Sequence, residues 1–186
     1  TPKGELTAIS EFDPRAGTTW TVKYPVESMD DIDRIVSVPW QLPADLKTGE
    51  SVDNSSTEER RIVHRTFVSS PLVCVAGMMH YDWFLELALA EPKLIARLTE
   101  ICRVRILEIL KVLLSRPGIE CVQLGGSEWV TPPMASPAIY DELVQEQESD
   151  IIDYTHANSD AMVHVHCHGL MRHALGRTIE RGADYI

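Results

Sequence analysis

The sequence lacks several features that would place it in a whole class of proteins. Its 17 lysine and arginine residues are outnumbered by 28 acidic ones, which gives a formal net charge of −11. No overall attraction therefore draws it to nucleic acid or to an anionic membrane surface. No apolar run approaches the roughly 18–20 residues that span a bilayer. We expect neither nucleic acid nor a membrane as a partner.

The beginning of the chain also lacks familiar signals. Residues 1–5 (TPKGE) contain no methionine and nothing that resembles a signal peptide. We interpret the chain as starting inside a longer protein of the cytoplasm. Hydrophobic residues make up 44 % and charged residues 24 % of the 186 positions, as in globular proteins, so the length suits one folded domain.

Cysteine is scarce and widely spaced. The four residues Cys74, Cys102, Cys121 and Cys167 form no CxxC pair. The first three fall in apolar runs with strand or helix character, where a thiol behaves as a small hydrophobic group. This pattern fits buried, reduced thiols in a reducing compartment. Cys167 differs because it stands among histidines.

The first half of the chain predicts a mixture of short elements. Apolar and β-branched residues with turn signals between them favour strands, and Ser28 followed by acidic residues favours a capped helix start. The expected elements are strands at 6–12 and 18–24, a helix at 28–36, a polar loop at 41–60 leading into a short charged helix, a β-rich segment at 65–76 and a helix at 80–90.

The second half alternates regularly between helices and strands. The expected order is helix 92–115, strand 120–124, helix 136–158, strand 161–166, helix 169–181 and a strand from 183. Strands separated by helices of this length indicate a parallel sheet with crossover helices, an α/β architecture. A complete eight-stranded barrel takes about 250 residues, so a barrel in this chain would be incomplete.

Chemistry is expected at two strand ends, because ligands of parallel α/β folds bind at the carboxyl ends of the strands. The first end is Gly125-Gly126-Ser127-Glu128, followed by a loop that Pro132 and Pro133 stiffen. A carboxylate there can accept a proton, bind a cation or hold a substrate. A solvated loop acid is the equally open alternative for Glu128.

The second strand end is Met162-Val-His-Val-His-Cys-His-Gly169, with three histidines in five residues. Alternation along a strand places His164, His166 and His168 on one face and Cys167 on the other. Imidazole and thiolate are preferred zinc ligands, which makes His166, His168 and Cys167 candidate ligands. Hydrogen-bonded structural histidines are the alternative, and one straight strand seldom supplies three ligands to one ion.

Other side chains at strand-to-helix boundaries are candidates for substrate binding. His80 and Tyr81 follow Gly77, Trp129 follows Glu128, and Arg172 lies in the first turn of the last expected helix. The first two also fit an ordinary helix start, and Arg172 also fits a surface position.

These motifs together resemble the uroporphyrinogen decarboxylase superfamily. The similarity runs through nearly the whole chain, with short motifs in a specific order. They are Thr1-Pro2-Lys3-Gly4-Glu5-Leu6, Gly77 to Trp83, Gly126-Ser127-Glu128, Pro132-Pro133, Ser136-Pro137, Tyr140, His166-Cys167-His168-Gly169 and Gly182-Ala183-Asp184.

The resemblance implies a (β/α)8 TIM barrel, of which residues 1–186 would be a single partial domain. Decarboxylases of this superfamily bind a tetrapyrrole without a cofactor, through an arginine-rich segment that would precede Thr1. Corrinoid-linked methyltransferases instead use zinc held by a His-x-Cys pair and a later cysteine. His166 matches the family histidine, His168 occupies the cysteine position and Cys167 is offset by one. The later ligand would follow Ile186.

The histidines favour a zinc-using methyltransferase that moves a methyl group from a corrinoid to a thiol-type acceptor. In that scheme Glu128 and His166 are catalytic, zinc is a cofactor with a third ligand from outside this chain, and a small molecule and possibly a corrinoid protein are partners. One alternative is a cofactor-free uroporphyrinogen decarboxylase. Another is a non-catalytic barrel remnant or partner subunit.

Overall fold

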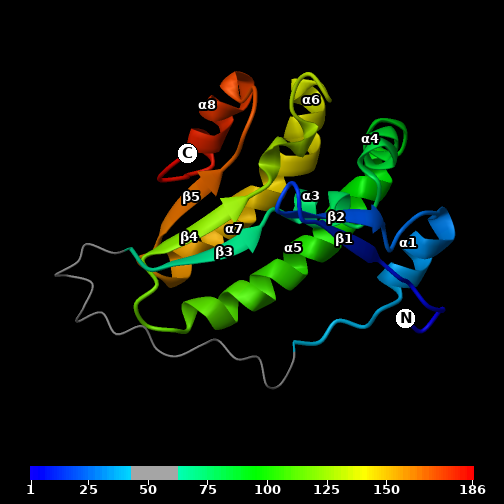
Figure 1. Ribbon diagram of the computed structural model, residues 1–186. Helices are drawn as coiled ribbons and strands as arrows, with labels where there is room; N and C mark the ends of the chain where they lie inside the picture. Colours follow the sequence, from blue (N-terminus) through cyan, green and yellow to red (C-terminus); the bar gives the residue numbers. More distant parts are fainter. Residues whose placement is uncertain (43–62) are drawn as a thin grey trace.

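A parallel three-stranded sheet and the helices on one of its faces form the centre of the molecule (Figure 1). The computed structural model describes residues 1–42 and 63–186. Most of the loop expected at 41–60, and the short charged helix after it, lie outside the described residues. Within those residues, no helix is long and apolar enough to cross a bilayer.

The amino-terminal part is an antiparallel hairpin followed by a short helix. Strands β1 (Ile9–Asp13) and β2 (Thr18–Lys23) pair across a turn, as the sequence predicts. Helix α1 (Met29–Val36) begins after Ser28, whose hydroxyl oxygen accepts a hydrogen bond from the Asp31 N–H. This cap satisfies one of the free N–H groups of the first turn.

The central sheet consists of β3 (Arg65–Ser69), β4 (Cys121–Gly125) and β5 (Met162–His166), paired in parallel in that order. Tyr185 extends it beyond β5, because its carbonyl accepts from the Val165 N–H at 2.9 Å. The strands therefore follow one another in chain order, as in a parallel α/β fold with crossover helices. The described residues form part of such a fold, and a closed barrel is not seen.

Helices connect the strands, and the two longest of them, α5 (Pro92–Leu114) and α7 (Glu146–Asn158), cover one face of the sheet. The other helices are α3 (Pro71–Ala76), α4 (Tyr81–Ala90), α6 (Pro137–Tyr140) and α8 (Arg172–Glu180). A π-helical segment, η2 (Asp141–Gln145), joins α6 to α7. The single helix expected at 136–158 is thus helical throughout, with a wider turn in its first half.

One expected element is wrong in part. Only Arg65–Ser69 of the predicted β-rich segment 65–76 is a strand, and Pro71–Ala76 is helix α3. Proline is tolerated in a first helical turn, where its missing N–H has no partner to lose. Helical geometry also buries Leu72 and Val75 completely. Burial has overridden the β preference of the valines, and Cys74 consequently lies on a helix.

One of two apolar core clusters lies between the sheet and the two long helices, α5 and α7. Val122 and Leu124 of β4 and Val163 of β5 pack with Ile106 of α5 and Ile151 of α7, all buried. The opposite face of the same strands carries the alternate side chains, including the histidines of β5. Because side chains alternate along a strand, one face of the sheet packs into the core and the other carries the candidate site histidines.

Charged side chains are buried where α6, α7 and α8 meet. Arg181 and Glu148 have side chains only 1 % and 0 % exposed, and their charged atoms are 3.0 Å apart. Arg181 also donates to the Tyr140 hydroxyl at 3.2 Å and to Thr178 Oγ1 at 3.0 Å. These contacts connect the last helix to the rest of the fold.

Candidate functional site

The site lies at the carboxyl edge of the sheet, toward which β3, β4 and β5 all point (Figure 1). Directly after β4, Gly126 has φ of +102°, a conformation that other residues rarely adopt. A Cβ atom there would lie 2.6 Å from the side chain of Val73 on α3. Glycine at this position lets the chain turn sharply into the short 3-10 helix η1 (Ser127–Val130).

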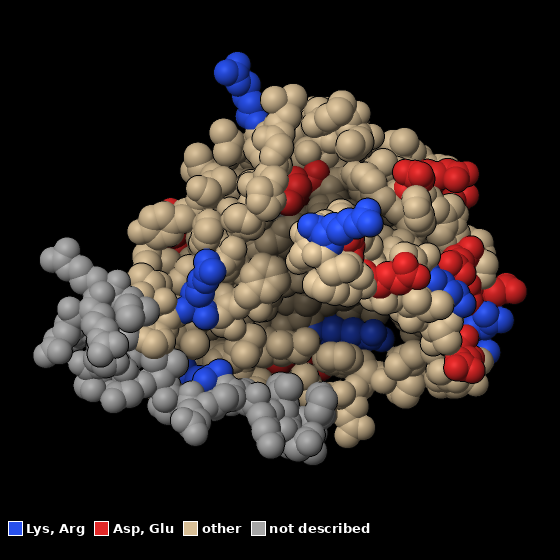
Figure 2. All heavy atoms as spheres, viewed as in Figure 1, with Lys and Arg blue, Asp and Glu red and all other residues tan. Residues whose placement is uncertain are grey.

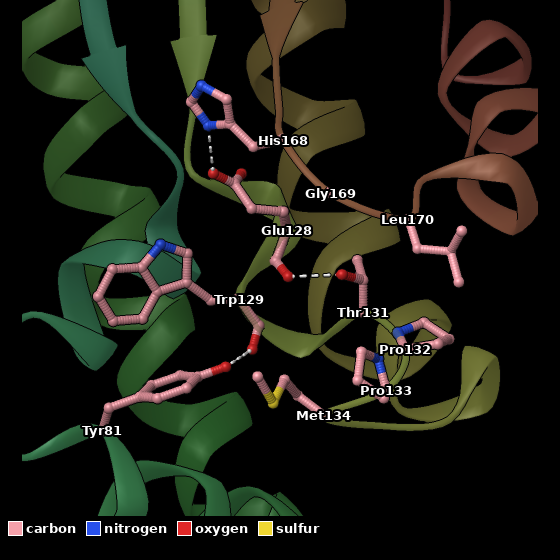
Figure 3. A pocket seen from close by; sticks show the side chains of 10 residues that line it. All are labelled: Tyr81, Glu128, Trp129, Thr131, Pro132, Pro133, Met134, His168, Gly169 and Leu170. Carbon is pink, nitrogen blue, oxygen red and sulfur yellow. Dashed lines mark hydrogen bonds and ion pairs between the residues drawn. The ribbon is translucent and has the colours of Figure 1, made fainter.

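A cavity of about 500 Å³ opens beside this turn. Figure 3 shows its walls, which come from three separate parts of the chain. The first is Tyr81 of α4, the second is Glu128 and Trp129 of η1 together with the following loop 131–134, and the third is residues 168–170 after β5. The lining is largely aromatic, aliphatic and prolyl, with polar groups concentrated at one end. This is the usual composition of a small-molecule site.

The polar end of the cavity is a carboxylate–imidazole pair. Glu128 Oε1 lies 3.1 Å from His168 Nδ1, and the two side chains are 20 % and 71 % exposed. Glu128 Oε2 is buried and has no hydrogen-bond donor among the described residues. When His168 donates its Nδ1 proton to Glu128, its Nε2 lone pair can accept a proton or bind a metal.

The three histidines share one face of β5 and its extension, as the alternation predicts. The ring centroids of His164 and His166 are 5.8 Å apart, and those of His166 and His168 are 4.6 Å apart, both edge to face. Burial lowers the pKa of His164, and nearby His166 and Arg65 lower it further. His164 therefore favours its neutral form, deeper along the strand than the cavity.

Cys167 points elsewhere. Its half-buried side chain packs against an apolar core cluster, away from the histidine face. Burial raises the pKa of this thiol, with a further contribution from Glu128. Within residues 1–42 and 63–186, no three histidine, cysteine or acidic side chains converge closely enough to hold a metal ion. The described residues therefore do not complete the expected zinc site.

The candidates for substrate binding separate into two groups. Tyr81 and Trp129 line the cavity, where the Tyr81 hydroxyl donates to the Trp129 carbonyl at 2.7 Å and the ring centroids are 5.1 Å apart. Burial raises the pKa of Tyr81, which keeps the hydroxyl protonated as a donor. His80 instead lies against the Tyr24 ring, and Arg172 begins α8; neither belongs to the lining.

Sequence reasoning did not single out several lining residues. Met134 and Leu170 are 50 % and 64 % exposed and contribute apolar wall. The prolines after Thr131 do the same, although the sequence marked them only as stiffening the loop. Their position beside a strand end is the one signal that could have identified them. The roles assigned to Glu128 and His166 stay predictions.

The fold and the site define a parallel α/β protein with a ligand-sized pocket at the ends of its strands. No family model matches the sequence, and no curated protein matches it. Among solved structures, its fold resembles that of a methyltransferase from Methanosarcina mazei, with a TM-score of 0.61 and 9 % sequence identity. The match covers 96 % of this chain and 51 % of the methyltransferase, so this chain spans about half of that protein's length.

Proposed function

We propose that this chain carries part of a methyltransferase-like enzyme of the uroporphyrinogen decarboxylase superfamily. The observation that carries the proposal is the strand-end pocket, in which Glu128 and His168 pair at the rim of an apolar wall. The fold likeness to the Methanosarcina mazei methyltransferase and the strand-end motifs support it. The proposed reaction transfers a methyl group from a corrinoid to a thiol-type acceptor.

In this reaction His168, oriented by Glu128, removes the proton of the acceptor thiol. Glu128 Oε1 holds the Nδ1–H of His168, and His168 Nε2 accepts the proton of the acceptor S–H group. The sulfur forms a bond to the methyl carbon, whose bond to the donor breaks and leaves its electron pair on the donor. Tyr81 and Trp129 provide the apolar wall against which the acceptor lies.

Zinc is a separate part of the proposal. A bound zinc ion would lower the pKa of the acceptor thiol. His166 and His168 would hold it, with Glu128 orienting His168 through Nδ1, and a third ligand would come from outside the described residues. His168 Nε2 would then be a zinc ligand in place of its role as proton acceptor. Cys167 would have to leave the core to join them. The described residues do not by themselves form a complete metal site.

The two alternatives have less support. A tetrapyrrole with propionate groups needs cationic partners; the resemblance places these before Thr1, and the described lining of the cavity adds no lysine or arginine to them. A non-catalytic barrel remnant does not explain why a carboxylate and an imidazole pair at the rim of a pocket. The cytoplasm and a corrinoid-protein partner stay predictions from the sequence.

The test is methyl transfer by the full-length protein from methylcobalamin to a small thiol, followed as loss of the methyl–cobalt absorbance and formation of the thioether. We expect Glu128→Gln to lower turnover about 10–100-fold, the range for a residue that orients a reacting group. Glu86→Gln removes an exposed carboxylate from α4 and should leave turnover unchanged. Absence of transfer in well-folded wild type would refute the function. Elemental analysis of wild type and of His166→Ala tests zinc separately.

A further inference from the structure

Two apolar side chains of the cavity wall are largely uncovered. Met134 is 50 % exposed and Leu170 is 64 % exposed, and they border the cavity from different segments of the chain (Figure 3). Covering exposed apolar area stabilises a complex roughly in proportion to the area removed from water. A ligand that covers both side chains gains most when its own body is apolar.

The two hydroxyl groups of the lining are already hydrogen-bonded within the protein. The Tyr81 hydroxyl donates to the Trp129 carbonyl at 2.7 Å. The Thr131 hydroxyl donates to the Glu128 carbonyl, also at 2.7 Å. A polar group on a ligand would have to compete with these contacts for either proton. Tyr81 and Thr131 therefore contribute carbon atoms to the wall rather than free donors.

The backbone holds both uncovered side chains in place. The Met134 N–H donates to the Thr131 carbonyl at 2.9 Å. On the other segment, the Met171 N–H donates to the Gly169 carbonyl at 3.0 Å, which closes the turn that carries Leu170. A wall whose backbone is already ordered loses less conformational entropy when a ligand binds.

We infer that Met134 and Leu170 determine which acceptor the proposed reaction uses, and that this acceptor is a thiol on an apolar alkyl or aryl body rather than a thiol with a polar tail. The sulfur has to lie at His168, which removes its proton, and Leu170 is two residues further along the same segment. The carbon chain of the acceptor then extends from that end along the wall. The inference rests on the proposed function, because it names the substrate class of the same site.

Charged side chains on the surface limit which acceptors can be compared. Figure 2 shows both basic and acidic side chains around the central hollow of the face that it draws. A charged tail would respond to such charges as well as to the apolar wall. The comparison therefore uses two uncharged thiols of equal length, 1-butanethiol and 3-mercapto-1-propanol, which differ by a methyl group in place of a hydroxyl group.

The test measures kcat/KM for methyl transfer from methylcobalamin to each thiol by the full-length protein. We expect the value for 1-butanethiol to be at least about 10-fold higher, because the hydroxyl group would lose its water against apolar side chains. Calorimetric affinities of the two thioether products, butyl methyl sulfide and 3-(methylthio)-1-propanol, should differ in the same direction and require no turnover. Equal affinities, tighter binding of the hydroxyl compound, or binding of neither thioether would overturn the inference.

Single variants assign the preference to the two side chains. Met134→Ser and Leu170→Ser change exposed positions, so both are expected to fold. Each should lower the preference for butyl methyl sulfide about fourfold, the effect of about one CH₂ group. Leu89→Ser is the matched control, since Leu89 is 56 % exposed on α4 outside the described lining, and it should keep the preference. An unchanged preference in both wall variants would overturn the inference.

The two proposals can fail separately. Methyl transfer to both thiols without a preference would refute the inference and leave the proposed function standing. Tighter binding of butyl methyl sulfide without any methyl transfer would refute the proposed function and leave the apolar selectivity of the pocket established.

Discussion

Arg181→Leu should be among the most damaging single substitutions in the chain. The Arg181 and Glu148 side chains are 1 % and 0 % exposed and 3.0 Å apart. Removing the arginine leaves a carboxylate buried without its cation, which typically costs about 3–5 kcal/mol. Since whole domains unfold with about 5–15 kcal/mol, we expect a large fall in the midpoint of urea unfolding, followed by circular dichroism.

Two further variants serve as controls. Arg181→Leu combined with Glu148→Leu removes both charges and should recover much of the loss, because apolar replacement of a buried pair is often neutral or stabilising. Arg177→Leu breaks the partly exposed contact with Asp141 and should cost far less. A small loss for Arg181→Leu, or a loss that the double replacement does not reduce, would refute the reasoning.

Three other predictions concern single positions. Gly126→Ala should lower the free energy of unfolding by at least about 2 kcal/mol, measured in urea, because φ is +102° and the new Cβ would lie 2.6 Å from Val73; an unchanged midpoint would contradict this. The Val163 N–H donates to Asp184 at 2.7 Å and lowers the pKa of that carboxyl below 3.8. Asp184→Asn should therefore destabilise the protein at pH 7, with the difference from wild type fading as the pH falls below about 4, and a constant difference would count against it. Burial raises the pKa of the Cys102 thiol to about 12, so Cys102 should react with a thiol reagent at pH 8 only after unfolding, as mass mapping of the labelled peptide would reveal.

Much of the chain was predictable because helix and strand patterns depend on near neighbours. The alternation of helices and strands from residue 92 onward indicated a parallel sheet, and β4 and β5 pair in parallel. The same parallel order implied that the residues after each strand share one edge. Glu128 and His168 were therefore candidates on position alone, before any contact between them was known.

Local pattern failed where packing between distant segments decided the outcome. Residues 71–76 have a β-like composition, yet they form a helix because that geometry buries Leu72 and Val75. Arg181 and Glu148 look like surface charges in the sequence, and they are buried because each supplies the countercharge that the other needs. The hydrophobic periodicity of the sequence does not reveal a contact between two such distant residues.

The sequence by itself determined the order of the elements and which residues follow each strand. The tertiary structure alone decided which of those residues meet. It brings His168 to Glu128, 40 positions away, and Tyr81 to Trp129, 48 positions away, and it turns Cys167 toward the core. The physical reason is that side-chain alternation is a property of one strand, whereas contact between strand ends depends on the register and packing of several.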